Sequence, residues 1–220
     1  MTKDNNSNLI FPKWSNKVPL IILTLLGGGF FVAVFVVYYW FSPKHLNVGY
    51  EPEQPVKYSH ALHAGQLGID CRYCHGNVDK GERLVVPAAQ TCLNCHSMIQ
   101  KNNPEIMKIR QSVVDNEPIE WVRVHHLGDY AYFNHSRHVK SGMGCATCHG
   151  NIHQQAVVRQ SEPLSMGWCL DCHRNPEKYV RPLSEITNMD WHAEDQAALG
   201  KELVATYHLN PNQDCSTCHR

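Results

Sequence analysis

The chain has 220 residues, and its 20 basic and 20 acidic side chains leave no formal net charge. This balance, together with the lack of a basic stripe, argues against nucleic acid as a partner. Hydrophobic residues make up 43% of the chain, and the long apolar run near the N-terminus leaves the rest only moderately apolar.

The chain begins with a polar segment, residues 1–17, which carries three lysines and one aspartate. Residues 18–41 then form an uncharged apolar run, long enough for a membrane-spanning helix, which needs about 20 residues. Tyr38 to Phe41 supply aromatic side chains that suit the membrane interface, and the positive start predicts a cytoplasmic N-terminus. A cleaved signal peptide is the alternative, but its apolar core would be shorter and would end at small residues. We expect an uncleaved anchor in the lipid bilayer.

Three glycines, Gly27 to Gly29, lie in the middle of this run. Small residues let another helix approach closely, which favours membrane partners, although glycine is also common in isolated membrane helices. Residues 42–57 follow, with three prolines and no hydrophobic periodicity. They are typical of an extended tether to a following domain, residues 58–220.

Each of the ten cysteines lies in a Cys-x-x-Cys-His pentad, the attachment signature of haem c. The two thiols bind one porphyrin, and the histidine that follows binds its iron. Zinc ribbons, thioredoxin-like motifs and disulfide frameworks would each leave the repeated histidine unexplained. We therefore expect five covalently bound haems c. The ten attachment cysteines are Cys71, Cys74, Cys92, Cys95, Cys145, Cys148, Cys169, Cys172, Cys215 and Cys218, and the five proximal iron ligands are His75, His96, His149, His173 and His219.

Haem c is attached outside the cytoplasm in bacteria, so we expect a single-pass protein of the bacterial inner membrane with its haem domain in the periplasm. Because the porphyrins would supply much of the apolar core, the predicted fold class is mostly helical and irregular. We expect short helices, long loops and little sheet after one N-terminal transmembrane helix.

An internal repeat organises the haem domain. Residues 58–96 and residues 133–173 share an aromatic-x-His-x-x-His opener, a Cys-x-x-Cys-His-Gly-Asn motif and a further pentad. Two di-haem units are therefore predicted, with a fifth haem at residues 215–219.

A haem that carries electrons needs a second axial ligand, His or Met. The opener histidines are the best candidates, because positions i and i+3 of a helix project the same way. They are His60, His63, His135 and His138. For the remaining iron, His125 and Met166 stay open as alternatives, and Met166 is equally able to pack against a porphyrin as an ordinary side chain.

Two stretches of the sequence are familiar, residues 121–138 (WVRVHHLGDYAYFNHSRH) and residues 162–169 (EPLSMGWC). The His-x-x-His openers resemble c3/c7-type multihaem cytochromes, and the two stretches resemble the pentahaem cytochrome c subunit of alternative complex III. That resemblance implies an electron-transfer subunit of a quinol-oxidising respiratory complex. Its implied partners are an iron–sulfur subunit, polytopic quinol-binding membrane subunits, and a downstream monohaem cytochrome c or terminal oxidase.

Two other functions are weighed against this one. A stand-alone quinol dehydrogenase of the membrane-anchored tetrahaem family would share the single anchor, but that family has four haems and different spacing. A multihaem reductase would need an open iron, and the abundant histidines argue against one. The chain is therefore expected to carry electrons without catalysing a reaction by itself.

Overall fold

The structure is a computed structural model that describes residues 12–81 and 86–219. Its contacts divide the chain into two units, residues 1–46 and residues 47–220, and each unit is described by itself. Residues 1–11 of the polar segment expected in the cytoplasm lie outside the described residues.

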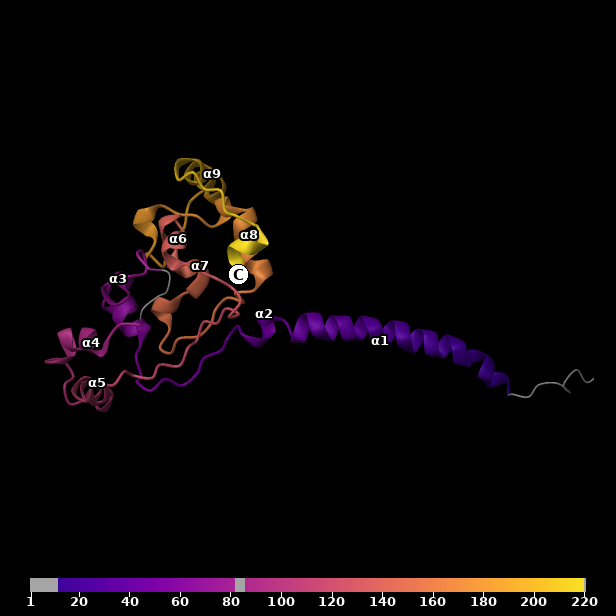
Figure 1. Ribbon diagram of the computed structural model, residues 1–220, viewed down its shortest axis with the longest axis horizontal. Helices are drawn as coiled ribbons and strands as arrows, with labels where there is room; N and C mark the ends of the chain where they lie inside the picture. The colour runs from indigo at the N-terminus through magenta and orange to yellow at the C-terminus, as the bar shows by residue number, and fades with distance from the viewer. Residues whose placement is uncertain (1–11, 82–85, 220) are drawn as a thin grey trace, which may run out of the picture. The chain divides into compact units, whose positions relative to one another are not determined.

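Helix α1, Val18–Trp40, covers nearly all of the predicted apolar run (Figure 1). Its proline lies in the first turn, where the missing N–H costs no helical hydrogen bond. The helical stretch from Trp14 to Trp40, which includes most of η1 (Lys13–Lys17), contains an 18-residue window with a mean hydropathy of 2.7, and no side chain of α1 is buried. A helix that is apolar on all sides and is not covered by its own chain has the composition expected of a membrane span.

The segment expected to be a tether has two different parts. A short helix, α2 (Pro43–Leu46), follows α1 in the first unit. Residues 47–57 belong to the second unit, where they are bonded to other segments. The Gly49 N–H donates to the carbonyl of Gln160 at 2.8 Å, and the Gln54 side chain bonds the backbone of Val122 twice, at 3.0 Å each.

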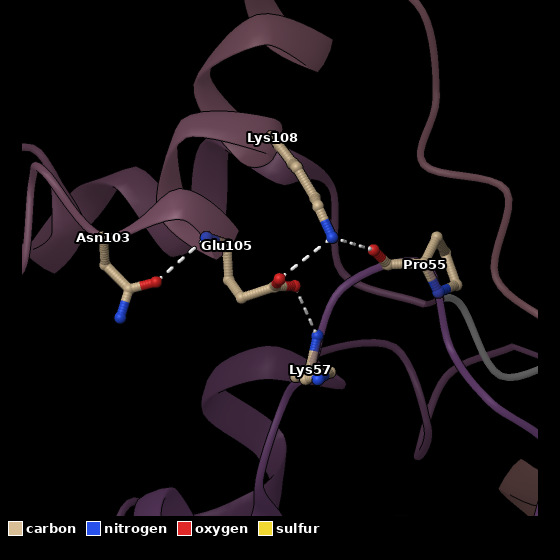
Figure 2. A network of polar contacts seen from close by, with 5 residues as sticks. All are labelled: Pro55, Lys57, Asn103, Glu105 and Lys108. Carbon is tan, nitrogen blue, oxygen red and sulfur yellow. Dashed lines mark hydrogen bonds and ion pairs between the residues drawn. The ribbon is translucent and has the colours of Figure 1, made fainter.

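Figure 2 shows how the end of this segment is held on helix α5, Pro104–Asp115. The Glu105 carboxylate accepts from the Lys57 N–H at 2.9 Å and pairs with Lys108 at 2.9 Å. Lys108 also donates to the carbonyl of Pro55 at 3.0 Å. Beneath this network, Val56 packs with the buried side chains of α5 in a small apolar cluster.

The rest of the second unit consists of short helices joined by long irregular segments (Figure 1). Within the described residues there is no strand, only two isolated bridges. The predicted fold class is therefore confirmed. The remaining helices are α3 (Cys71–Cys74), α4 (Ala89–His96), α6 (His135–Lys140), α7 (Cys145–His149), α8 (Met166–Arg174), α9 (Gln196–Thr206) and α10 (Cys215–Cys218), with a π-turn η2 (Ala61–Gln66) and 3-10 turns η3 (Ile152–Gln154), η4 (Pro176–Lys178) and η5 (Leu183–Glu185).

The two repeats pack on each other reciprocally. In the first opener, the Ala61 N–H donates to the carbonyl of Gln155, which follows the first pentad of the second repeat, at 3.0 Å. In the second opener, the Ser136 N–H donates to the carbonyl of Gly81, which follows the first pentad of the first repeat, at 3.3 Å. Each opener therefore lies between a pentad of its own repeat and the matching part of the other.

The apolar core is small for a domain of this length, so a large share of its apolar contacts has to come from something other than aliphatic side chains. Its buried hydrophobic residues within the described part are Val56, Ile106, Ile109, Val124, Cys172, Val180, Ile186, Met189 and Leu203. A close backbone contact joins α9 to η4, where a Cβ at Gly200 would overlap the carbonyl of Glu177.

Candidate haem-binding sites

All five pentads lie on a single helical turn or at the end of a helix. Two of the helices start at a side-chain cap: Asp70 accepts from the N–H of Arg72 at 2.8 Å, and Ser165 accepts from the N–H of Trp168 at 3.3 Å. Because positions i and i+3 share one face of a helix, each turn presents both thiols on the same side. None of the ten cysteines forms a disulfide, so no disulfide framework competes with this use.

Two histidine pairs face each other at a separation that suits one metal ion. The rings of His63 and His96 have centroids 6.1 Å apart, and those of His138 and His173 are 6.2 Å apart. Imidazole nitrogen binds transition metals at about 2 Å, so two rings on opposite sides of one ion have centroids roughly 6 Å apart. The second histidine of each opener therefore lies, with the histidine of the second pentad of its own repeat, at a spacing that suits a shared metal ion.

Hydrogen bonds orient these imidazoles. The Nδ1 atoms of His63 and His138 lie 2.8 Å from the carbonyls of Ser59 and Asn134, one turn earlier in each opener. A carbonyl at Nδ1 fixes the proton there and leaves Nε2 as the free donor for a metal. The proximal histidines of the second, fourth and fifth pentads make equivalent contacts: His96 with Ile99 at 3.0 Å, His173 with Asn212 at 2.7 Å and His219 with Tyr130 at 3.2 Å.

An aromatic ring holds both histidines of each opener. Tyr58 meets His60 edge-on at 4.8 Å and stacks on His63 at 4.5 Å. In the second repeat Phe133 contacts its two histidines, at i+2 and i+5, at 4.7 Å and 4.4 Å. The aromatic residue of the repeat thus acts as a spacer that fixes the direction of both imidazoles.

The first histidines of the openers lie near the first pentads. Burial, followed by the neighbouring imidazoles of His75 and His63, lowers the pKa of His60 to about 4. Burial also lowers the pKa of His149 to about 3, with contributions from the imidazoles of His125 and His135. Neutral imidazole is the form that binds a metal. His60 and His149 are therefore held in the neutral form that a metal ligand needs.

The second pentad lies next to the first. The Asn94 side chain, inside the second pentad, donates to the hydroxyl of Tyr73, inside the first, at 3.1 Å. Burial raises the pKa of Cys74, and the next largest cause is the nearby thiol of Cys92.

The first and third pentads are held by two consecutive residues of one loop. The carbonyl of Ile186 accepts from the N–H of Cys145 at 3.0 Å, and the hydroxyl of Thr187 donates to the carboxylate of Asp70 at 2.7 Å. Their leading thiols consequently interact, and a hydrogen bond with Cys145 is the main cause that lowers the pKa of Cys71 to about 7. The two repeats meet at this junction.

The series continues to the fifth pentad. Burial raises the pKa of Cys148 to about 12, and the next cause is Cys172 of the fourth pentad. The fourth pentad contacts the segment that precedes the fifth, because the Nδ1 of His173 contacts the carbonyl of Asn212. Neighbouring pentads thus follow the order second, first, third, fourth, fifth without a gap.

Two parts of the chain match known cytochrome families. Residues 131–220 match the family described as "Cytochrome c7 and related cytochrome c", and residues 41–122 match the "Class III cytochrome C family". The chain is a multihaem cytochrome c of the c3/c7 type. Cytochromes c of these families bind haem c covalently, and the cysteine pentads and paired histidines described above fit that group.

The cytochrome is also similar to a curated protein named "Menaquinone reductase, multiheme cytochrome c subunit" from Nitratidesulfovibrio vulgaris (strain Hildenborough). The two sequences are 27% identical over 193 residues, which cover 86% of each protein. The relative is named as a multihaem cytochrome c, which agrees with the two family matches.

The fifth pentad of the cytochrome docks against the start of the second repeat. Ala131 forms an isolated bridge with His219, and the N–H of Tyr132 donates to the carbonyl of Cys218 at 2.8 Å. Among the described residues, the ring of His219 contacts that of Tyr130 at 5.7 Å. No ring contact there pairs His219 with a second histidine at the spacing of a shared metal ion. The ring contacts of His219 therefore do not supply a distal histidine for this site.

The two alternatives expected from the sequence occupy different places in the cytochrome. The Nε2 of His125 lies 3.3 Å from the Nδ1 of His149, and the two rings are 4.4 Å apart. That contact is with the far side of a proximal imidazole, and it is shorter than the spacing across a metal ion. Met166 begins α8 and its side chain is 61% exposed. Both residues stay candidates for the remaining ligand.

Two arginines beside the pentads were not anticipated from the sequence. Arg110 donates to the carbonyls of His96 and Ser97 at 2.9 and 2.7 Å, and so braces the second pentad. Arg181 lies beside the third pentad, where it packs against Gly144. A pair of glycines at positions 142 and 144, just before a pentad, was the signal that a bulky side chain packs there.

Proposed function

We propose that this cytochrome is the electron-relay subunit of a membrane complex that oxidises quinol, carrying five haems c on the periplasmic side of the bacterial inner membrane. The supporting observation is the unbroken order of neighbouring pentads. Each haem c supplies one-electron redox chemistry when bound. The chain's own part is to hold the five attachment sites close together and to keep their axial imidazoles neutral and oriented.

The ligand assignment follows the repeats. His60 and His135 would serve the first pentad of each repeat, and His63 and His138 the second. Rigidly held imidazoles on both sides of an iron limit its rearrangement when its charge changes, which is what an electron carrier requires. With two histidine ligands each, the four irons of the two repeats would also have no open position for a substrate.

Membrane attachment through α1 fits the same role. Its positively charged start favours a cytoplasmic N-terminus, so the haem domain would lie outside, where haem c is attached. An iron–sulfur subunit and polytopic quinol-binding subunits would be its partners, with a monohaem cytochrome c or a terminal oxidase as the electron acceptor.

A second candidate is the opposite direction of flow, into quinone. The similar protein from Nitratidesulfovibrio vulgaris carries the name of a menaquinone reductase subunit, and an electron relay works equally well in both directions. Which direction operates depends on the partners and on the haem potentials.

Purification of the tagged cytochrome from its native membrane in mild detergent tests the proposal. We expect large membrane subunits to co-purify, the complex to oxidise a menaquinol analogue, and the isolated chain to be inactive in the same assay. Quinol oxidation by the isolated chain would contradict the proposal and support a stand-alone quinol dehydrogenase. A complex that only reduces quinone, given reduced cytochrome as donor, would support the second candidate.

A further inference from the structure

Arg181 is a buried charged residue that belongs neither to the pentads nor to the candidate axial ligands. Its side chain is 8% exposed. The backbone N–H of Arg181 donates to the carbonyl of Gly142 at 2.9 Å, beside the isolated bridge between Met143 and Val180. A Cβ at Gly144 would overlap the guanidinium, so the chain makes room for this group directly before the third pentad.

The guanidinium is bound by neutral groups. Its Nη1 donates to the carbonyls of Glu185 and Asn188 at 3.4 and 2.9 Å, and the group lies over the ring of Trp191 at 5.1 Å. Among the described residues no carboxylate forms an ion pair with it, and its buried Nε has no hydrogen-bond partner. An arginine stays protonated even when burial lowers its pKa. The positive charge is therefore permanent.

This charge lies at the junction of the two repeats. The loop that accepts its hydrogen bonds, residues 185–188, is the same loop that binds the N–H of Cys145 and the carboxylate of Asp70. Gly144, against which the guanidinium packs, is the residue before Cys145. The first and third pentads therefore meet beside a cation that forms no direct ion pair among the described residues.

We propose that Arg181 raises the reduction potential of the haem attached at Cys145. This inference rests on the proposed haem attachment at that pentad. Reduction adds one negative charge, and a nearby fixed positive charge stabilises the reduced form. The effect is strong where water is excluded, because charges interact more strongly at a low effective dielectric constant. Burial and nearby charge are among the means by which a protein sets a haem potential.

A role in packing alone is the competing explanation, since Arg181 also closes a loop and stacks on Trp191. Charge and packing can be separated by substitution. Arg181→Lys keeps the charge, Arg181→Gln removes it while keeping a shorter polar side chain, and Lys178→Gln removes an equal charge from an exposed position.

The test is an equilibrium redox titration of the full-length, haem-loaded protein, followed optically, with the number of haems per chain measured by mass spectrometry. We expect Arg181→Gln to shift at least one potential downward, Arg181→Lys to shift it much less, and Lys178→Gln to leave all potentials unchanged. Arg181→Gln with a full haem complement and unchanged potentials would overturn the inference.

Should Arg181→Gln fail to mature, Glu185→Gln decides the question with the guanidinium in place. The Glu185 carboxylate is half-buried beside it and is bonded to the Asn188 side chain at 2.8 Å. Removing that negative charge should raise a potential, and an unchanged set would overturn the inference. Fewer than five haems on the unmodified chain would instead contradict the haem assignment, so the two failures are distinguishable.

Discussion

At the scale of single residues, the separation between histidine rings gives the most specific prediction of axial ligands. His63 and His138 each face a proximal histidine across about the distance that one metal ion spans. We predict that replacing either by alanine converts one low-spin iron to high-spin, because an axial ligand is lost. Electron paramagnetic resonance of the oxidised protein measures this change, and the same result is expected for His60→Ala and His135→Ala.

The matched control is His208→Ala, which removes a histidine that belongs to neither opener and follows α9. Its spectrum should be that of the unmodified protein. If all four opener variants keep an unchanged low-spin spectrum, these histidines are not ligands and the repeats have another use.

The remaining axial ligand is a choice between Met166 and His125. We predict that Met166→Leu abolishes any sulfur-to-iron charge-transfer absorption and lowers one haem potential, because a thioether ligand raises the potential above that of a bis-His haem. Absorption spectra and a redox titration measure both effects. If the spectrum and all potentials are unchanged, Met166 only packs, and loss of a low-spin signal in His125→Ala would identify that histidine instead.

At the scale of elements, the contact of α9 with η4 depends on one glycine. We predict that Gly200→Ala destabilises the domain by about 1–3 kcal/mol, because the new Cβ would overlap the Glu177 carbonyl and force the backbone to shift. The thermal unfolding midpoint by circular dichroism should fall. Lys201→Ala, an exposed neighbour in the same helix, should leave the midpoint nearly unchanged; an equal loss in both would remove the packing argument.

Helix α1 leaves its three central glycines open, since a Cβ at Gly27, Gly28 or Gly29 would meet nothing within 4 Å. We predict that replacing all three by leucine weakens co-purification with membrane subunits, because a partner helix can no longer approach closely. Haem content should be intact. Replacing Val32, Val34 and Val36 by leucine is the matched control, and full recovery of the complex with both variants would contradict a contact at the glycines.

At the scale of the whole molecule, local patterns were predictable and long-range contacts were not. The apolar run at residues 18–41 predicted α1, and the five haem-attachment pentads predicted short helices in place of sheet, because the porphyrins would supply much of the core. Both follow from motifs that are local in the sequence. The tether is different: proline content indicated an extended chain, but residues 47–57 are bonded to α5 and to Gln160, contacts that no local pattern encodes.

The junction between the repeats shows the same limit. Matched spacing predicted two similar units, yet nothing local indicates that residues 185–188 would hold the first and third pentads together. The burial of Arg181 at that point depends on Gly144 and Trp191, which are far apart along the chain. Local spacing thus identifies the groups that bind haem, and tertiary packing decides which of them are neighbours.

The proposal as a whole depends on five haems joined to one anchored chain. The mass of the denatured full-length protein, purified from its native membrane, tests this most directly because thioether-bound haem survives denaturation. The predicted mass is that of the complete polypeptide, including residues 1–41, plus five haems. A mass that accounts for four haems or fewer would contradict the five-site relay, and loss of the first ~40 residues would contradict the anchor, whose apolar run exceeds the ~20 residues of a span.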